Sequence, residues 1–174
     1  PERTALVPAL FARHGLHARL YPSCHARHPV HDFLAGDDAL RLADLHAAFA
    51  EPGNAAVFCL RGGHGCTRLL DRVDAGLLRA HAKPFIGYSD ITALHALLGH
   101  QGVPSFHAPM PGSDLVADGA QDDADALFHL LMNPLPAGHV FFTPDLLPGA
   151  WHVAGRASGP LVGGNLRLMA ALAT

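Results

Sequence analysis

The sequence predicts an α/β fold, with a mainly parallel sheet and helices on both of its faces. Two apolar runs, Ala55–Leu60 and Pro84–Tyr88, are continuous rather than alternating, as in strands buried on both faces of a parallel sheet. A glycine-bearing turn and an amphipathic stretch follow each run. Strands and helices that alternate in this way fold with right-handed crossovers between neighbouring parallel strands.

Before the first buried run, the chain contains two predicted helices and one predicted strand. Apolar residues three and four apart predict a helix over Thr4–His14. Leu16–Leu20 alternates apolar and polar residues and predicts a short strand. Asp37 or Asp38 can cap a second helix that runs through Phe49.

After the first buried run, the alternation continues to residue 132. We predict helices over Thr67–Val73, Asp90–Leu98 and Asp122–Met132, and a strand over Val103–His107. Residues 1–132 are therefore expected to form one α/β domain.

The last part of the chain has a different character. Residues 133–160 are rich in proline and glycine and include one candidate strand, "HVFF" at residues 139–142, so we expect a connection. Residues 161–174 combine two glycines with an apolar helix, which predicts the start of a junction to a C-terminal domain that this chain lacks.

Charge and hydropathy exclude several classes of partner. The net charge of −3 includes no basic surplus for nucleic acid, and no apolar run approaches the roughly 20 residues that span a bilayer. No signal peptide is visible at the start of the chain. We therefore expect no nucleic-acid partner and no membrane association.

Cysteine and histidine usage argues against disulfides and metals. The three cysteines include no CxxC pair, which favours a reduced, cytoplasmic setting. His25, His28 and His31 recur every third residue, but Pro22 and Pro29 break any helix that would align them. Compositional bias explains the 14 histidines better than a metal site, and no cofactor is expected.

The turn after the second buried run carries a candidate nucleophile, Ser89. A serine between a strand and a helix projects its hydroxyl above the sheet edge, and the helix N-terminus supplies backbone N–H groups beside it. Gly87 lets the backbone bend, although Ile91 stands where G-x-S-x-G has its second glycine. The alternative is that Ser89 or Asp90 only caps the helix.

The turn after the first buried run, "RGGHG" at residues 61–65, is glycine-rich. Gly62 and Gly63 can aim backbone N–H groups at an anion, such as the oxyanion formed when a serine attacks a carbonyl. A phosphate-binding loop is a weaker alternative, because neither GxGxxG nor GxxxxGK[ST] is present. A tight packing turn is the third alternative.

Four ordered motifs resemble those of the LD-carboxypeptidase family, which includes the microcin-immunity peptidases. They are "RGGHGCTRLLDRVD", "KPFIGYSDITALHALL", "FHAPM" and "GPLVGGNLRLMAALAT", and "FLAGDDALRLADLHAAFAEPGNAAVFCLRGG" resembles the segment before the first motif. His64 replaces the usual tyrosine and Ala108 the usual glycine, departures that concern the shape of the pocket.

The resemblance implies a serine peptidase that uses no metal and cleaves an L-to-D peptide bond. The substrate would be a muropeptide or another peptidyl conjugate, typically the murein tetrapeptide of cytoplasmic cell-wall recycling, which loses its terminal D-alanine. Ser89 would be the nucleophile, and the N–H groups of Gly63 and Asp90 the oxyanion hole. The family also implies a homodimer.

The resemblance leaves the catalytic set incomplete, because the family places its catalytic Glu and His after the "GGNL" motif. Here that motif is Gly163–Leu166, and the two glutamates, Glu2 and Glu51, both precede Ser89. His95 or His107 could in principle replace the missing base. Two classes of function remain: an incomplete LD-carboxypeptidase, or a non-catalytic binding or structural protein that retains the fold.

Overall fold

The computed structural model describes residues 2–133, 135–139, 155–156 and 158–173. Its sheet has three parallel strands in the order β1-β2-β3, which are Val57–Phe58, Phe85–Gly87 and Phe106–His107. Val57 lies opposite Phe85, and Ile86 lies opposite Phe106. β2 is the central strand, so its C-terminal end is the middle of the sheet edge.

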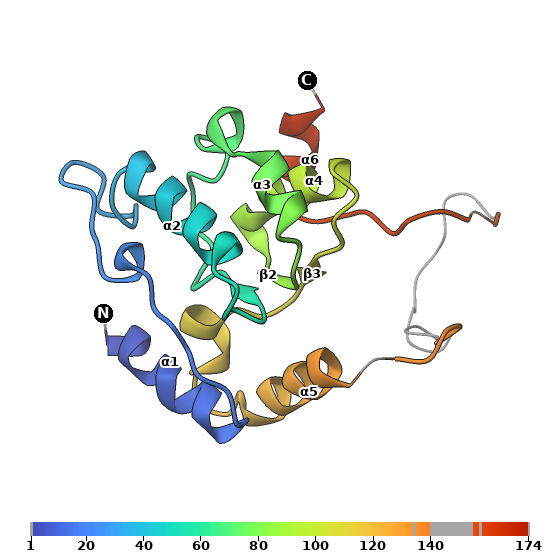
Figure 1. The fold of residues 1–174 in the computed structure, drawn as a ribbon, viewed down its shortest axis with the longest axis horizontal. Coiled ribbons are helices and arrows are strands. Elements are labelled where there is room, and N and C mark those ends of the chain that lie inside the picture. Colours follow the sequence, from blue (N-terminus) through green and yellow to red (C-terminus); the bar gives the residue numbers. More distant parts are fainter. Residues whose placement is uncertain (1, 134, 140–154, 157, 174) are drawn as a thin grey trace.

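Helices cover both faces of the sheet, as the sequence predicts (Figure 1). On one face lie α2 (Asp38–Ala50), α3 (Ala75–Ala80) and α4 (Thr92–His100). Their apolar side chains form a core with β1 and β2; its fully buried members include Phe49, Leu78, Phe85 and Leu98.

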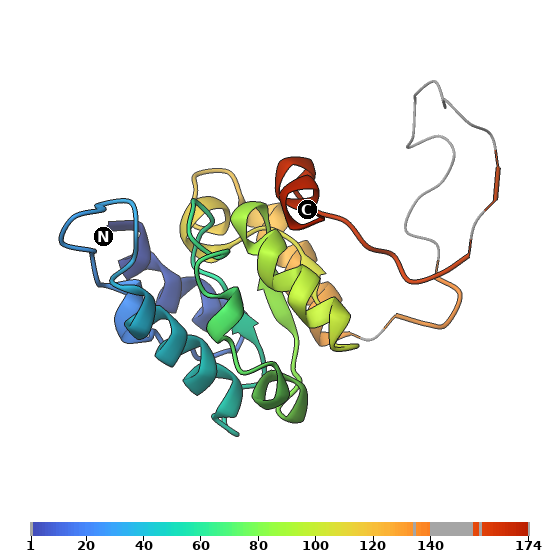
Figure 2. The same cartoon turned by 90° about the horizontal axis from the view of Figure 1, so that it is seen from above.

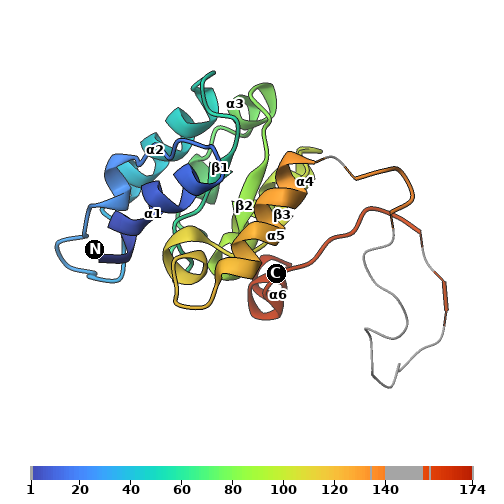
Figure 3. The ribbon, with the colours of Figure 1, turned by 90° about the horizontal axis from the view of Figure 1, so that it is seen from below.

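On the other face lie α1 (Glu2–Arg13) and α5 (Gln121–Met132), which Figure 3 shows from their own side. Phe11 of α1 contacts Phe58 of β1 and Phe128 of α5 edge to face, with ring centroids 5.0 and 5.1 Å apart. Neighbouring residues of β1 thus point to opposite faces of the sheet. Val57 belongs to the core with α2, α3 and α4, and Phe58 packs against the core with α1 and α5.

The predicted strand over Leu16–Leu20 is wrong, because the segment has no regular secondary structure. A strand requires a hydrogen-bonded neighbour. Residues 17–20 make no backbone hydrogen bond to another described segment. Residues 17–20 and 55–60 instead line one cavity of about 1350 Å³. Leu16, Ala18 and Leu20 pack against the core formed by α1 and α5, and this packing explains the alternating pattern without strand pairing.

The predicted helix over Thr67–Val73 is also wrong. The chain there forms turns and one short 3-10 helix, Leu70–Arg72. The helix begins later, as α3, because the carboxylate of Asp74 accepts a hydrogen bond from the Leu77 N–H at 2.8 Å and caps it. The strands β1 and β3 are also shorter than predicted.

The C-terminal helix α6 (Leu166–Leu172) packs against α4 (Figures 1 and 2). The Asn165 N–H donates to Thr92 Oγ1 at 2.9 Å, and the Asn165 side chain caps α6 by accepting from the Leu168 N–H. The described parts of 133–160 contain no helix or strand, and residues 140–142 of the candidate strand "HVFF" lie outside the described residues.

Candidate active site

Ser89 lies directly after β2 and Tyr88, at the C-terminal edge of the sheet, and is half-buried. Its φ is +63°, the one positive φ of a non-glycine residue in the described part of the chain. Left-handed backbone is unfavourable for residues with a Cβ and occurs most often where function requires it. The strand therefore presents Ser89 on a strained turn.

The residues around Ser89 explain why the chain turns there. A Cβ on Gly87 would lie 2.9 Å from Ile91 Cγ2 and 3.1 Å from Cys59 Cβ, so only glycine fits beneath the turn. After Ser89 the chain enters a 3-10 turn, Ser89–Ile91, that leads into α4. The Asp90 N–H thus belongs to the first turn of a helix, where backbone N–H groups lack intrahelical acceptors.

The glycine-rich turn contacts Ser89 directly. A Cβ on Gly62 would lie 3.1 Å from Ser89 Cβ and 3.4 Å from Ser89 Oγ. Gly63, with φ of +129°, adopts a conformation that side chains rarely allow. Neither the Gly63 N–H nor the Asp90 N–H donates to an acceptor among the described residues. The glycine-rich turn thus lies against Ser89, and each of the two turns carries an N–H donor without an acceptor among the described residues.

The buried Asp90 side chain joins the two turns. Its Oδ2 accepts a hydrogen bond from the Cys66 N–H at 2.9 Å, at the far end of the glycine-rich turn. Burial, with Asp90 nearby, raises the pKa of the Cys66 thiol, and burial raises the pKa of the Cys59 thiol to about 12. Both thiols therefore stay protonated near neutral pH, and a protonated thiol is a poor nucleophile.

His95 is not positioned to act as a base for Ser89. Its Nε2 lies 2.8 Å from the Gly87 carbonyl oxygen and its Nδ1 lies 2.7 Å from Ser105 Oγ, so both ring nitrogens are occupied. Burial lowers the pKa of this imidazole. The neutral ring donates from Nε2 to the Gly87 carbonyl and accepts at Nδ1 from Ser105, which supports the end of β2 beside the turn that carries Ser89.

The second local histidine is exposed and also makes no bond to Ser89. The His107 ring contacts the Tyr88 ring at 6.0 Å and the His95 ring at 5.9 Å. Within the described residues, no imidazole forms a hydrogen bond with the Ser89 hydroxyl. The two glutamates offer no replacement: Glu51 accepts from Arg19 and from the Gly53 N–H, and Glu2 is in the first turn of α1.

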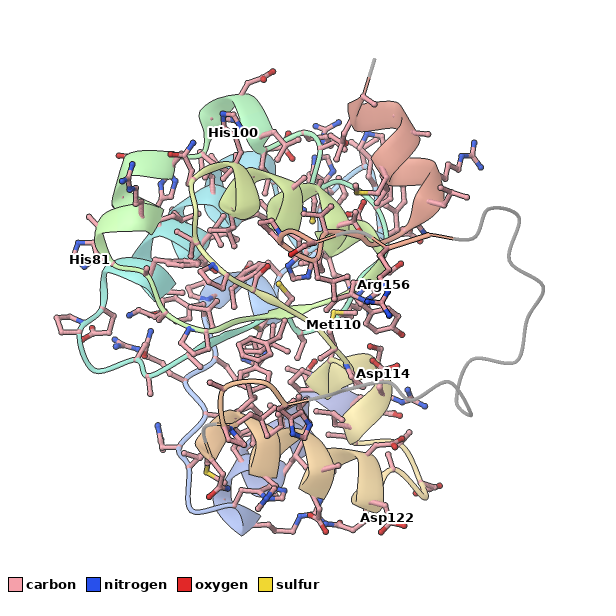
Figure 4. All side chains as sticks on the ribbon, turned by 90° about the vertical axis from the view of Figure 1, so that its right-hand side faces the viewer. His81, His100, Met110, Asp114, Asp122 and Arg156 are labelled. Carbon is pink, nitrogen blue, oxygen red and sulfur yellow. The ribbon has the colours of Figure 1, made fainter. Side chains whose placement is uncertain are left out.

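Sequence reasoning missed the network around Asp114. Its Oδ1 accepts from the Tyr88 hydroxyl at 3.0 Å, and its Oδ2 accepts from the Met110 N–H and Ser113 Oγ at 2.8 Å each. Figure 4 shows Met110 and Asp114 next to each other, away from Asp122 at the start of α5. An aspartate after Pro-Gly-Ser signals a turn, but only the fold brings it to the residue before Ser89.

Asp114 also borders a smaller cavity of about 310 Å³, beside the turn that carries Ser89. Tyr88, His107 and Asp114 are among its lining residues. The side-chain hydrogen bond to Asp114 raises the pKa of the Tyr88 hydroxyl. The turn that carries Ser89 is therefore adjacent both to this cavity and to the glycine-rich turn.

The described residues contain no group of three or more His, Cys, Asp or Glu side chains that could hold a metal ion. The histidines His28 and His31 stack on each other at 4.9 Å instead. In the same part of the chain, no helix is long and apolar enough to cross a membrane.

The segment that carries both turns is similar to a known protein family. Residues 2–108, which include both turns, match the LD-carboxypeptidase N-terminal domain. The chain belongs to the LD-carboxypeptidase family. A probable murein peptide carboxypeptidase of Bacillus subtilis is 41% identical over 141 residues, and the murein tetrapeptide carboxypeptidase of Pseudomonas aeruginosa is 37% identical over 168 residues.

The chain spans about half the length of these curated relatives. The alignments cover 80% and 92% of this chain but 43% and 52% of the relatives. Solved structures agree with the fold. A MccF-like protein of Bacillus anthracis has a TM-score of 0.66 at 28% identity, over 75% of this chain and 39% of its own. A muramoyltetrapeptide carboxypeptidase of Oxalobacter formigenes has a TM-score of 0.68 at 25% identity, over 76% and 44%.

Proposed function

We propose that this chain is the nucleophile-bearing part of a serine carboxypeptidase. The complete enzyme cleaves the L-to-D peptide bond of murein tetrapeptide and releases the terminal D-alanine. Ser89 attacks the scissile carbonyl carbon, and the N–H groups of Gly63 and Asp90 stabilise the resulting oxyanion. The observation that carries the proposal is the left-handed backbone of Ser89, at the end of the central strand and in contact with Gly62.

The names of the relatives support the substrate class. The relatives from Bacillus subtilis and Pseudomonas aeruginosa are named for murein peptide and murein tetrapeptide. The free N–H groups of Asp90 and Gly63 support acyl transfer, because oxyanion donors must not be used by other acceptors. The occupied ring nitrogens of His95 and the ion pair of Glu51 with Arg19 support a general base other than these two residues.

The family resemblance implies that the catalytic Glu and His of the proposed enzyme lie in a C-terminal domain, outside residues 1–174. A serine without a base is a weak nucleophile near neutral pH. We therefore expect residues 1–174 alone to release little D-alanine. The domain division follows the same reasoning: residues 1–132 form the α/β domain, 133–160 connect, and 161–174 begin the junction.

A hybrid enzyme tests the proposal. Residues 1–174 replace the matching segment of the Bacillus subtilis relative, and release of D-alanine from murein tetrapeptide is measured. The hybrid should be active and insensitive to chelators. Ser89→Ala should lower kcat by several orders of magnitude, because members of a catalytic set act as a unit. Ser158→Ala, at an exposed serine, is the matched control.

Two results would contradict the proposal. If the hybrid with Ser89→Ala kept its activity, Ser89 would not be the nucleophile. If a soluble, folded hybrid bound the tetrapeptide without cleaving it, the non-catalytic binding protein would be the better interpretation.

The proposal includes cytoplasmic cell-wall recycling and a homodimer, as the family resemblance implies. All three cysteines are free thiols, which supports a reducing compartment. Leu161, Val162 and Leu166 expose 94%, 77% and 83% of their surface beside the C-terminal helix, which supports a contact with further protein at this place.

A further inference from the structure

The guanidinium of Arg61 lies beside the proposed oxyanion donor Gly63. Its Nη1 is 3.1 Å from the position that a Cβ on Gly63 would occupy. Two backbone carbonyl groups hold it there: Nη2 donates to Phe33 O at 2.7 Å, and Nη1 donates to Gly62 O at 3.4 Å. The side chain therefore has a defined place although it is exposed.

The charge of Arg61 is not neutralised within the described part of the chain. A guanidinium has five N–H groups, and two hydrogen bonds of Arg61 are seen. No described carboxylate forms an ion pair with it, whereas Arg19, Arg41 and Arg68 each pair with an aspartate or glutamate. Arg61 thus offers a fixed positive charge and unused donors to a ligand.

A carboxypeptidase must bind the terminal carboxylate of its substrate close to the oxyanion. The scissile carbonyl carbon and the terminal carboxylate carbon are separated only by the amide nitrogen and one Cα, so they lie about 3–4 Å apart. A group that binds the carboxylate must therefore border the oxyanion hole. Arg61 contacts Gly63 and satisfies this condition.

We propose that Arg61 binds the C-terminal carboxylate of the substrate and so restricts the enzyme to the last peptide bond. This rests on the proposed function of the Ser89 site. An arginine suits the role because its planar fork can hold a carboxylate while other N–H groups remain on the two carbonyl oxygens. A lysine ammonium at the same position cannot reproduce that arrangement.

A binding comparison tests the proposal on residues 1–174. An acetylated peptide that ends in L-Lys-D-Ala is titrated as its free acid and as its C-terminal amide, and the amide resonances of Gly62 and Gly63 are followed by NMR. The free acid should bind about tenfold more tightly, because a charge-assisted pair is lost in the amide. Arg61→Gln should abolish this preference, and Arg61→Lys should reduce it.

Two controls separate recognition from folding. Arg79→Gln removes an exposed positive charge on α3 and should keep the full preference. Thermal unfolding of the Arg61 variants shows whether loss of the bond to Phe33 O has damaged the fold. The comparison of acid with amide on the unaltered chain is informative even if a variant unfolds.

The outcomes distinguish this proposal from the proposed function. Equal binding of acid and amide near Gly63, or a preference that survives Arg61→Gln, overturns the role of Arg61 while leaving Ser89 as the candidate nucleophile. Binding of neither peptide also overturns it. Ser89→Ala should keep the preference for the acid, since carboxylate binding does not need the nucleophile, whereas the same change abolishes D-alanine release by the hybrid.

Discussion

Replacing Ser89 by glycine should stabilise the protein while removing the proposed nucleophile. Ser89 has a φ of +63°, and no described residue forms a hydrogen bond with its hydroxyl, so its side chain contributes no bond that the change would lose. Glycine adopts this backbone conformation without a steric penalty. Alanine keeps the Cβ and therefore keeps the strain.

The comparison of Ser89→Gly with Ser89→Ala isolates the Cβ. Left-handed backbone costs a residue with a Cβ roughly 1–2 kcal/mol. Glycine loses about 0.5–1 kcal/mol more backbone entropy on folding than alanine does. The difference leaves Ser89→Gly more stable than Ser89→Ala by about 0.5–1 kcal/mol, the sign opposite to that of most glycine substitutions.

Urea unfolding of the two variants measures this difference. With a denaturant dependence of roughly 2 kcal/mol per molar, the glycine variant should unfold at a midpoint about 0.3–0.5 M higher. Ser158, an exposed serine without positive φ, provides the control pair, in which glycine should be no more stable than alanine. If Ser89→Gly unfolded at or below the midpoint of Ser89→Ala, the turn would not be strained.

Three further predictions concern other parts of the fold. Asp90→Ala should lower the free energy of unfolding by about 1–3 kcal/mol in the same urea assay, because the buried Cys66 N–H loses its acceptor. Asp90→Asn keeps an acceptor and should lower the free energy of unfolding less. Equal losses in the two variants would contradict this reasoning. The pKa of His95 is lowered in the folded state, so its contribution to stability is complete above the ordinary pKa of about 6.5 and is lost as the pH falls below it. When the pH is lowered from about 7.5 to about 5.5, the urea midpoint should therefore fall further in the unaltered protein than in His95→Gln. An equal fall in both proteins would refute the lowered pKa of His95. Leu161 and Leu166 are 94% and 83% exposed, so the chain should self-associate in light scattering, and serine at both positions should reduce the association. Unchanged association of the double variant would contradict a role for these two leucines.

The buried strands and the capped helices could be predicted because their signals are local. The continuous apolar run at Pro84–Tyr88 predicts a strand buried on both faces, and Phe85, Ile86 and Gly87 are buried. The carboxylate of Asp37 caps α2. The strand predicted over Leu16–Leu20 is wrong because a strand depends on a non-local partner. The segment alternates as a strand does, but no second backbone pairs with it.

The sequence by itself determined that a serine stands between a buried strand and a helix, that a glycine-rich turn follows another buried strand, and that both resemble one family. These are local facts of residue type and order. Only the tertiary structure decided that Gly62 touches Ser89, that the Asp90 carboxylate holds the Cys66 N–H, and that both ring nitrogens of His95 are occupied. Such contacts join residues far apart in the chain, because parallel strands bring their carboxyl ends to one sheet edge, and no periodicity within a segment encodes which side chains meet there.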